Sequence, residues 1–186
     1  GTYKGVPVTI MASGMGMPSM GIYSYELFKF YDVDNIIRVG SAGAYTEDLN
    51  LYDLVLVDSC YSESTYARTQ NGCNDNILHA SDSLNSKIKD TAQKLNKKIN
   101  IGMIHSSDVF YKDNNDFAYL FDKYGCLAVE MESFALFHNA KSLGKNAACI
   151  LTISDNLVTK EETTSQERQT AFTNMIEVAL DTVTNI

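Results

Sequence analysis

The sequence predicts an α/β fold in which a central sheet is flanked by helices. Short apolar runs typical of buried strands alternate with segments whose apolar residues recur every three or four positions, the spacing of an amphipathic helix. The chain has 186 residues, of which 45% are hydrophobic and 20% charged, a composition typical of one globular domain with a sizeable core. Strands that alternate with helices in this way predict a largely parallel sheet covered on both faces.

The elements follow one another without an internal repeat or a low-complexity linker. In chain order, the patterns predict a strand at 6–13, a helix at 19–31, strands at 35–40 and 54–59, a helix at 82–95, a strand at 100–105, a helix at 117–124, a strand at 126–129, a helix at 131–143, a strand at 147–153 and a helix from 165 onward. The polar stretch 62–75 is predicted to be a loop or hairpin. Residues 1–5 resemble the middle of a β-hairpin and no initiator methionine precedes them, so we expect residues 1–186 to be a single domain that lacks an N-terminal segment.

The last predicted helix carries an arginine on its apolar face. That face consists of Phe172, Met175, Ile176, Ala179, Leu180 and Val183. At about 100° per residue, Arg168 projects within about 40° of Phe172, so we expect its guanidinium to point toward the interior. The preceding strand ends on Ser154 and Asp155, and ligands of α/β sheets bind beyond the carboxyl ends of strands. Asp155 is therefore a candidate acid, and Arg168 its modulator.

These residues also have a purely structural interpretation. Thr164 and Glu167 have the spacing of a capping box, which would start the helix. Asp155 and Arg168 would then form a buried ion pair.

A second arginine lies inside an apolar strand. Residues 36–44 read Ile-Ile-Arg-Val-Gly-Ser-Ala-Gly-Ala, so Arg38 and Val39 are followed by a turn that starts at Gly40 and Ser41. A forked cation beside a hydroxyl group and flexible backbone amides suits an oxyanion such as phosphate. The alternative is that one of the chain's acidic residues neutralises Arg38.

Two carboxylates mark the start of the 131–143 helix. Glu130 and Glu132 flank Met131, and one of them is expected to face a cavity while the other faces outward. A carboxylate can accept two hydrogen bonds and so can bind a vicinal diol such as a ribose. Alternatively, both glutamates stabilise the helix dipole. His138 is interpreted as a core or rim residue, and the Gly-rich turn at 13–19 as a weak ligand-binding signal.

Charge and cysteine content exclude several function classes. The net charge of −8 disfavours binding to nucleic acid or to an acidic membrane surface. The four cysteines form no C-x-x-C pair and no metal-ligand spacing with the three histidines, which favours reduced thiols in a cytoplasmic protein. No apolar run is long enough to span a bilayer.

Taken together, four motifs resemble the bacterial hexameric purine nucleoside phosphorylases. They are Arg-Val-Gly-Ser-Ala-Gly at 38–43, Ser-Asp-Val-Phe-Tyr at 107–111, Val-Glu-Met-Glu at 129–132, and Ser154-Asp155 followed by residues 161–170. The resemblance runs along the whole chain in order and spacing. It implies a mixed central sheet flanked by helices, the nucleoside phosphorylase fold. It also implies reversible cleavage of purine ribo- or deoxyribonucleosides by orthophosphate, a co-substrate, with no metal or organic cofactor, in a homohexamer built from dimers.

The resemblance also implies a role for each motif. Arg38 and Ser41 would bind phosphate, with Val39 and Gly40 shaping the turn. Glu132 would hold the ribose hydroxyls, and Asp155, after Ser154, would be the general acid that Arg168 assists. The remaining nucleoside contacts would come from Met15 and Met131 near the sugar, and from Phe110, Val129 and Glu130 around the base.

Three other functions on the same fold are considered beside purine phosphorolysis, and single residues distinguish the first two of them from it. A nucleosidase on the same scaffold would use water and would not need Arg38. A uridine phosphorylase would be expected to lack the Ser154-Asp155 acid, because a pyrimidine has no N7 to protonate. The third rival is a non-catalytic nucleoside-binding protein.

Overall fold

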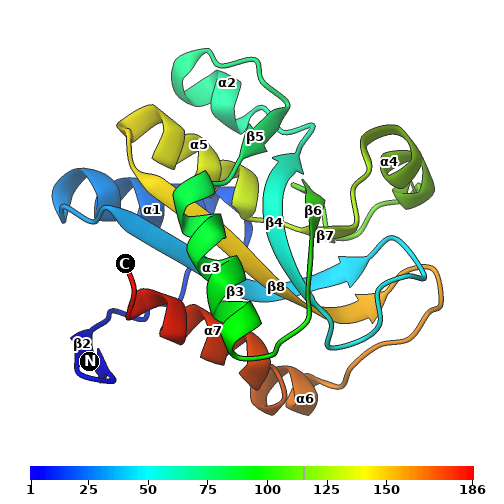
Figure 1. Cartoon of the computed structure of the whole chain (residues 1–186). Helices are drawn as coiled ribbons and strands as arrows, with labels where there is room; N and C mark the ends of the chain where they lie inside the picture. The colour runs from blue at the N-terminus through cyan, green and yellow to red at the C-terminus, as the bar shows by residue number, and fades with distance from the viewer. Residues whose placement is uncertain (115) are drawn as a thin grey trace.

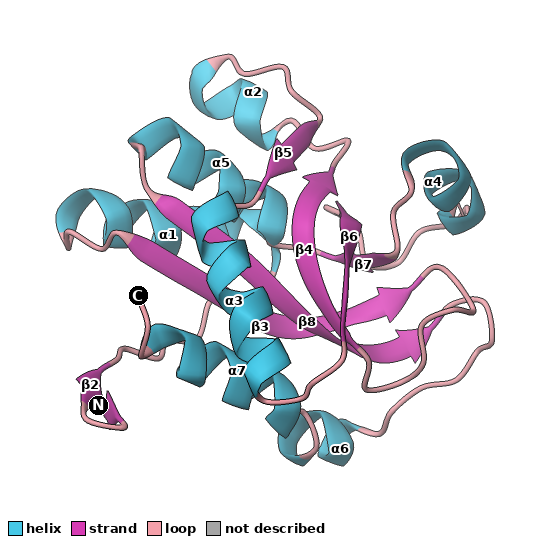
Figure 2. Ribbon diagram, in the orientation of Figure 1, coloured by secondary structure: helices cyan, strands magenta, loops and turns pink. Residues whose placement is uncertain are grey.

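In the computed structural model, which describes residues 1–114 and 116–186, helices cover both faces of a curved sheet (Figures 1 and 2). The strands are β1 (Thr2–Tyr3), β2 (Val6–Pro7), β3 (Asn35–Ala44), β4 (Leu54–Tyr61), β5 (Ile77–His79), β6 (Ile99–Ser106), β7 (Ala128–Glu130) and β8 (Asn146–Asn156). The helices are α1 (Gly16–Phe30), α2 (Tyr66–Asn71), α3 (Asp82–Lys94), α4 (Phe117–Tyr124), α5 (Ser133–Leu143), α6 (Ser165–Thr170) and α7 (Thr173–Val183). The predicted α/β class is confirmed.

The main sheet is mixed, with strand order β5-β4-β6-β7-β3-β8 and a further pairing of β4 with β8. That pairing closes β4, β6, β7, β3 and β8 into a ring. β3 runs parallel to β8 from Asn35 opposite Asn146 onward, and antiparallel to β7 at its end. Thus the ends of β3 and β8 and the start of α5 lie close together, where the predicted site residues are found.

Two separate apolar cores fill the two faces of the sheet. Residues of α1 and α5 pack on one face, with Met17, Phe134 and Phe137 fully buried. Residues of α3 and α7 pack on the other, where Ile88 and Val178 are fully buried. Glycines in the left-handed conformation, Gly125 and Gly144, end α4 and α5, a conformation that costs glycine little.

Three predicted elements are wrong in part. The 6–13 strand is limited to Val6–Pro7, which pairs with β1 in the expected hairpin. The 62–75 stretch contains α2, and β5 follows it. The C-terminal helix is two helices, because the backbone leaves helical geometry at Phe172, between α6 and α7. Phe172, Met175 and Ala179 are buried as expected, whereas Ile176 is 45% exposed and Val178 is buried instead.

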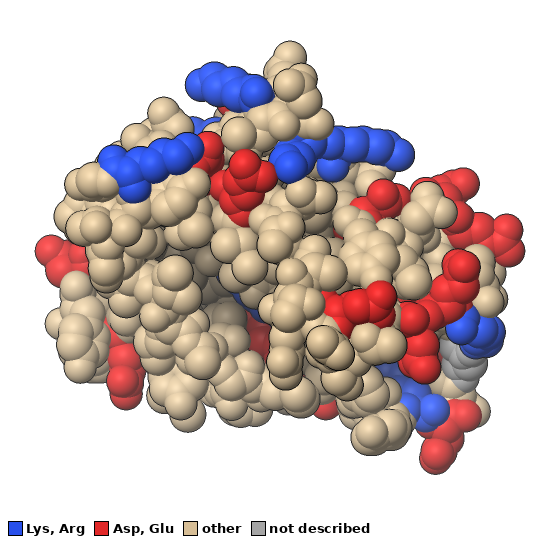
Figure 3. All heavy atoms as spheres, turned by 90° about the horizontal axis from the view of Figure 1, so that it is seen from below, with Lys and Arg blue, Asp and Glu red and all other residues tan. Residues whose placement is uncertain are grey.

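Acidic groups are prominent on the surface, consistent with the net charge of −8. In Figure 3 most of the acidic groups lie on one side of the face, Lys and Arg side chains lie along its upper edge, and the face is hollowed near its middle. None of the helices described is both long and apolar enough to span a bilayer.

Candidate active site

A buried cluster of one arginine and two glutamates lies between β3 and the start of α5. Nη2 of Arg38 donates to Oε2 of Glu132 and lies 3.3 Å from Oε2 of Glu130. The three side chains are at most 9% exposed. Burial disfavours the guanidinium charge, but the two carboxylates outweigh this effect and raise the pKa of Arg38. A buried arginine paired in this way matches the acidic neutralisation that the sequence left open.

The two glutamates have different tasks, and neither faces outward, so that expectation was wrong. Glu130 accepts hydrogen bonds from the backbone N–H groups of Glu132 (2.9 Å) and Ser133 (3.0 Å), which otherwise lack partners at a helix start. Glu132 accepts from the backbone N–H of Gly16 at 2.6 Å, at the start of α1. Glu130 therefore caps the start of α5, whereas Glu132 bridges the start of α1 and the Arg38 guanidinium.

Glycine at position 40 allows the guanidinium of Arg38 to fold back over its own strand. A Cβ at Gly40 would lie 2.3 Å from Nη1 and 2.8 Å from Cζ of Arg38. Any side chain at this position would displace the guanidinium from the glutamates. The predicted turn at 40–43 is wrong, because these residues continue β3 as far as Ala44 and pair there with β8. Gly40 instead allows the close approach of the guanidinium, and Ser41 is exposed.

The candidate acid lies at the end of β8. Asp155 is half-buried, and its Oδ1 accepts a 2.7 Å hydrogen bond from the hydroxyl group of Ser154. Gly43 of β3 leaves room for this carboxylate, because a Cβ there would lie 2.7 Å from Oδ2 of Asp155. The carboxyl group is therefore held in place on one oxygen.

Arg168 does not contact Asp155, so the expected inward arginine is not found in this conformation. Its Nε donates to Oγ1 of Thr163 and its Nη2 to the Thr163 carbonyl, each at 3.2 Å. The Thr163 hydroxyl in turn donates to the Ser154 carbonyl at 2.8 Å. The reason for the difference is that Arg168 lies on α6, a short separate helix without buried residues. The capping box of Thr164 and Glu167 that begins α6 is present as predicted.

Of the other predicted site residues, Met131 contacts this cluster through its backbone N–H, which donates to Oε2 of Glu132 at 3.3 Å. The exposed ones do not belong to it. Met15 is 75% and Phe110 71% exposed, and Val39 is 44% exposed. Val129 and Met131 are half-buried beside the glutamates in sequence. A groove of about 500 Å³ lies beside the start of α1, lined by residues that include Gly16, Ser64, Thr65 and Asp108.

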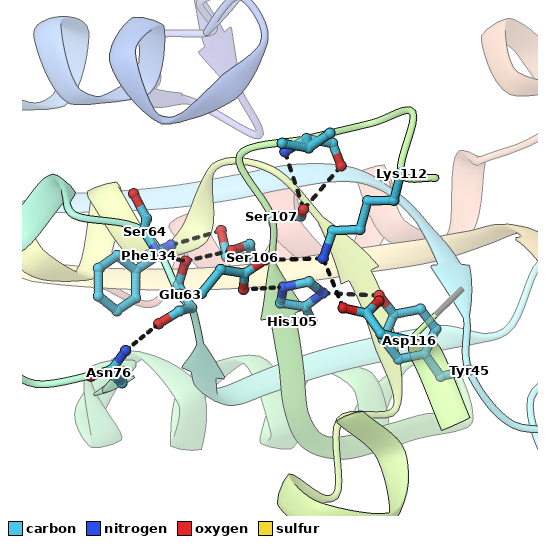
Figure 4. Close-up of polar contacts among 12 residues, drawn as sticks. Tyr45, Glu63, Ser64, Asn76, His105, Ser106, Ser107, Lys112, Asp116 and Phe134 are labelled. Atoms are coloured by element: carbon cyan, nitrogen blue, oxygen red, sulfur yellow. Dashed lines mark hydrogen bonds and ion pairs between the residues drawn. The ribbon is translucent and has the colours of Figure 1, made fainter. Parts of the chain in front are cut away.

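Sequence reasoning missed a polar network beside this groove, which Figure 4 shows. His105 of β6 is fully buried, with Nδ1 2.9 Å from the Tyr45 hydroxyl and Nε2 2.7 Å from Oε2 of Glu63. Oε1 of Glu63 accepts from Nζ of Lys112 at 3.0 Å. A histidine inside the predicted 100–105 strand was the available signal. His138, by contrast, is buried as interpreted.

Buried thiols lie close to the cluster. The Sγ of Cys149 is 3.6 Å from Nη1 of Arg38, and burial raises the pKa of Cys149 to about 11. All four cysteines are free, as expected. Within residues 1–114 and 116–186, no three His, Cys, Asp or Glu side chains gather in a way that could hold a metal ion.

Comparison with known proteins gives similarity along the full length. The family model described as "Phosphorylase superfamily" matches residues 1–186. A DeoD-type purine nucleoside phosphorylase of Clostridium perfringens is 46% identical over 97% of this chain and 77% of its own. One of Colwellia psychrerythraea is 43% identical over 98% of this chain and 78% of its own.

Two solved structures are similar in fold. A futalosine hydrolase mutant of Helicobacter pylori has a TM-score of 0.85 at 19% identity, covering 100% of this chain and 84% of its own. The 5′-methylthioadenosine/S-adenosylhomocysteine nucleosidase of Campylobacter jejuni has a TM-score of 0.83 at 19% identity, covering 94% and 79%. At this identity the likeness concerns the fold alone.

Proposed function

This chain belongs to the phosphorylase superfamily, and on that basis we infer that it is a purine nucleoside phosphorylase. The observation that carries this function is identity of 42–46% with DeoD-type enzymes over nearly the whole chain. The reaction transfers the pentose of a purine nucleoside to orthophosphate and releases the free base. It is a reversible glycosyl transfer.

We propose that the Arg38 guanidinium binds the phosphate, with Ser41 as a further donor. The support is a buried cation whose Nε, among the described residues, has no hydrogen-bond partner. In the free protein, Glu132 accepts from Nη2 of the same guanidinium. A phosphate that takes over this donor therefore releases Glu132, which can then accept from the 2′- and 3′-hydroxyl groups of the ribose.

We propose Asp155 as the general acid. As the bond between C1′ and N9 breaks, the sugar becomes oxocarbenium-like and the leaving purine gains the bond's electron pair. A proton from the Asp155 carboxyl group to N7 neutralises the base, and a phosphate oxygen attacks C1′ to form the pentose 1-phosphate. Acid catalysis of this type contributes about 10²- to 10⁴-fold, and proximity of phosphate to the sugar adds to it. Arg168 would have to leave Thr163 to assist Asp155.

The decisive experiment separates phosphorolysis from hydrolysis. The protein is incubated with inosine or adenosine, with and without phosphate, and base and ribose 1-phosphate are measured. Phosphate-dependent release with ribose 1-phosphate as product supports the proposal, while equal release without phosphate contradicts it. Arg38→Ala should raise the KM for phosphate far more than that for nucleoside, since a bond to a charged group contributes about 1.5–3 kcal/mol.

We further propose that the protein self-associates into a homohexamer built from dimers. The support is an apolar surface on α1, where Ile22 is 60% and Phe30 70% exposed, beside a groove of about 610 Å³. Native mass spectrometry tests the stoichiometry.

We also propose a cytoplasmic location, supported by the four free thiols. We propose in addition that the reaction needs no metal or organic cofactor. Activity that persists after dialysis against a chelator would agree with the last point.

A further inference from the structure

The loop between β6 and α4 carries Phe110, the residue expected to stack on the purine base. Its first residue, Ser107, is buried and donates its backbone N–H to the Glu130 carbonyl at 2.8 Å. Its middle is exposed: Phe110 is 71% and Tyr111 90% exposed. The next residue, Lys112, forms ion pairs with Glu63 at 3.0 Å and with Asp116, just before α4, at 3.2 Å. The loop is therefore held at both ends, and the side chains between them are exposed to solvent.

Glu63 is itself held in place by hydrogen bonds that lead through the buried His105 to Tyr45. Partial burial works against its charge, but the contacts with His105 and Lys112 lower the pKa of Glu63 to about 2, so it is ionised. An ionised carboxylate only accepts hydrogen bonds, so Nε2 of His105 donates to it. On the other ring nitrogen, His105 is bonded to the hydroxyl of Tyr45, whose pKa burial raises. The anchor of Lys112 thus reaches into the core (Figure 4).

The same contact joins the two walls of the groove next to Glu132. Ser64 and Thr65, which directly follow Glu63, line one wall, and Asp108 of the Phe110 loop lines the groove as well. Gly16, which donates to Glu132, is a further lining residue. The Glu63–Lys112 ion pair therefore links the two chain segments, 63–65 and 107–112, that contribute these lining residues.

We propose that Glu63 is a positioning residue for nucleoside binding: through Lys112 it orients the Phe110 loop over the groove. This inference rests on the proposed function, because Phe110 must be the base-stacking residue. A half-exposed ion pair contributes modestly, so its loss is expected to raise the KM for nucleoside by about two- to five-fold. Phosphate binds elsewhere, so the KM for phosphate and kcat should stay within about two-fold.

The test uses Lys112→Met, which keeps most of the length of the side chain and removes the charge that pairs with Glu63 and Asp116, alongside Glu63→Gln, which removes the pair with Glu63 alone. Amide hydrogen exchange of residues 107–112 in the free protein is expected to increase, and the KM for inosine to rise as stated. Lys112→Arg should restore both values. The matched control is Lys141→Met, which removes another ion pair, with Asp75 at 2.9 Å, on α5. It should change neither value.

Two results would overturn the proposal. Unchanged exchange of 107–112 in Lys112→Met and in Glu63→Gln would mean that the ion pair does not hold the loop. Increased exchange without a change in the KM for inosine would mean that the loop does not position the base. In a Phe110→Ala background, Lys112→Met should have no further effect on KM. If the unmodified protein does not phosphorolyse inosine, the proposed function fails, and the exchange result still decides whether Glu63 anchors the loop.

Discussion

Replacing Gly40 by alanine tests how tightly the arginine is held between its glutamates. The three atoms nearest to the new Cβ would be Nη1, Cζ and Nη2 of Arg38, at 2.3, 2.8 and 2.9 Å. Contacts this short are not tolerated, so the guanidinium must move. It cannot do so without weakening its contacts with Glu130 and Glu132.

The expected cost lies between two limits. Overpacking in a core costs about 1–3 kcal/mol, and complete loss of one partner of a buried ion pair about 3–5 kcal/mol. Replacing glycine by alanine also lowers the conformational entropy of the unfolded chain. This effect stabilises the folded state by about 0.4–1 kcal/mol and offsets part of the cost. We therefore expect Gly40→Ala to lower the free energy of unfolding by about 1–3 kcal/mol. The KM for phosphate should rise about ten-fold or more, the loss of one bond to a charged group.

The assay is a double-mutant cycle with Arg38→Met, measured by chemical denaturation. Once the guanidinium is gone, the methyl group introduced at position 40 no longer meets it, so Gly40→Ala should cost at least about 1 kcal/mol less in the Arg38→Met background. Additive costs would refute the reasoning, because the alanine would then clash with something other than Arg38. An unchanged KM for phosphate in Gly40→Ala would separately argue against Arg38 as the phosphate ligand.

Three further predictions concern the acid, the sugar and the groove. Asp155→Asn should slow inosine phosphorolysis by about 10²- to 10⁴-fold, and should largely spare an N7-methylated nucleoside, whose base needs no proton; equal slowing would make Asp155 an organising residue. Glu132→Gln should impair ribonucleosides more than 2′-deoxynucleosides in steady-state kinetics, and equal losses would indicate a scaffold role. The lowered pKa of Glu63 stabilises the folded state above its ordinary value near 4.5, and this contribution is lost as pH falls toward 2. The difference in unfolding free energy between the unmodified protein and Glu63→Gln should therefore shrink over that window, and a constant difference would contradict it.

The sequence predicted the residues that carry strong local signals. Periodicity located α4 at its observed bounds, and the Thr164–Glu167 spacing gave the capping box. Sequence reasoning failed where contacts between distant segments determine the local structure. Residues 8–14 are apolar enough for a strand but pair with no strand among the described residues. The 100° rule placed Arg168 on an inner face only because it assumed that one helix continues through Ala171 and Phe172.

The candidate site was predictable in its members but not in its contacts. The buried arginine and the two glutamates were each identifiable from their neighbours. That Glu132 accepts from both Arg38 and Gly16 depends on three segments that meet only in the folded chain. For the same reason, no local pattern could connect Glu63 to His105 and Lys112.

The position of β8 has a consequence for how the protein acquires its structure. β8 pairs with β3 from residue 35 opposite residue 146, and with β4 from residue 54 opposite residue 152. Contacts between residues so far apart in sequence form slowly, because a long loop must close before they stabilise anything. During synthesis, the ring of strands cannot close until residues 150–152, which pair with β4, have left the ribosome. Until then β3 and β4 expose backbone groups that β8 later covers, and this interval is when a chaperone would be needed most.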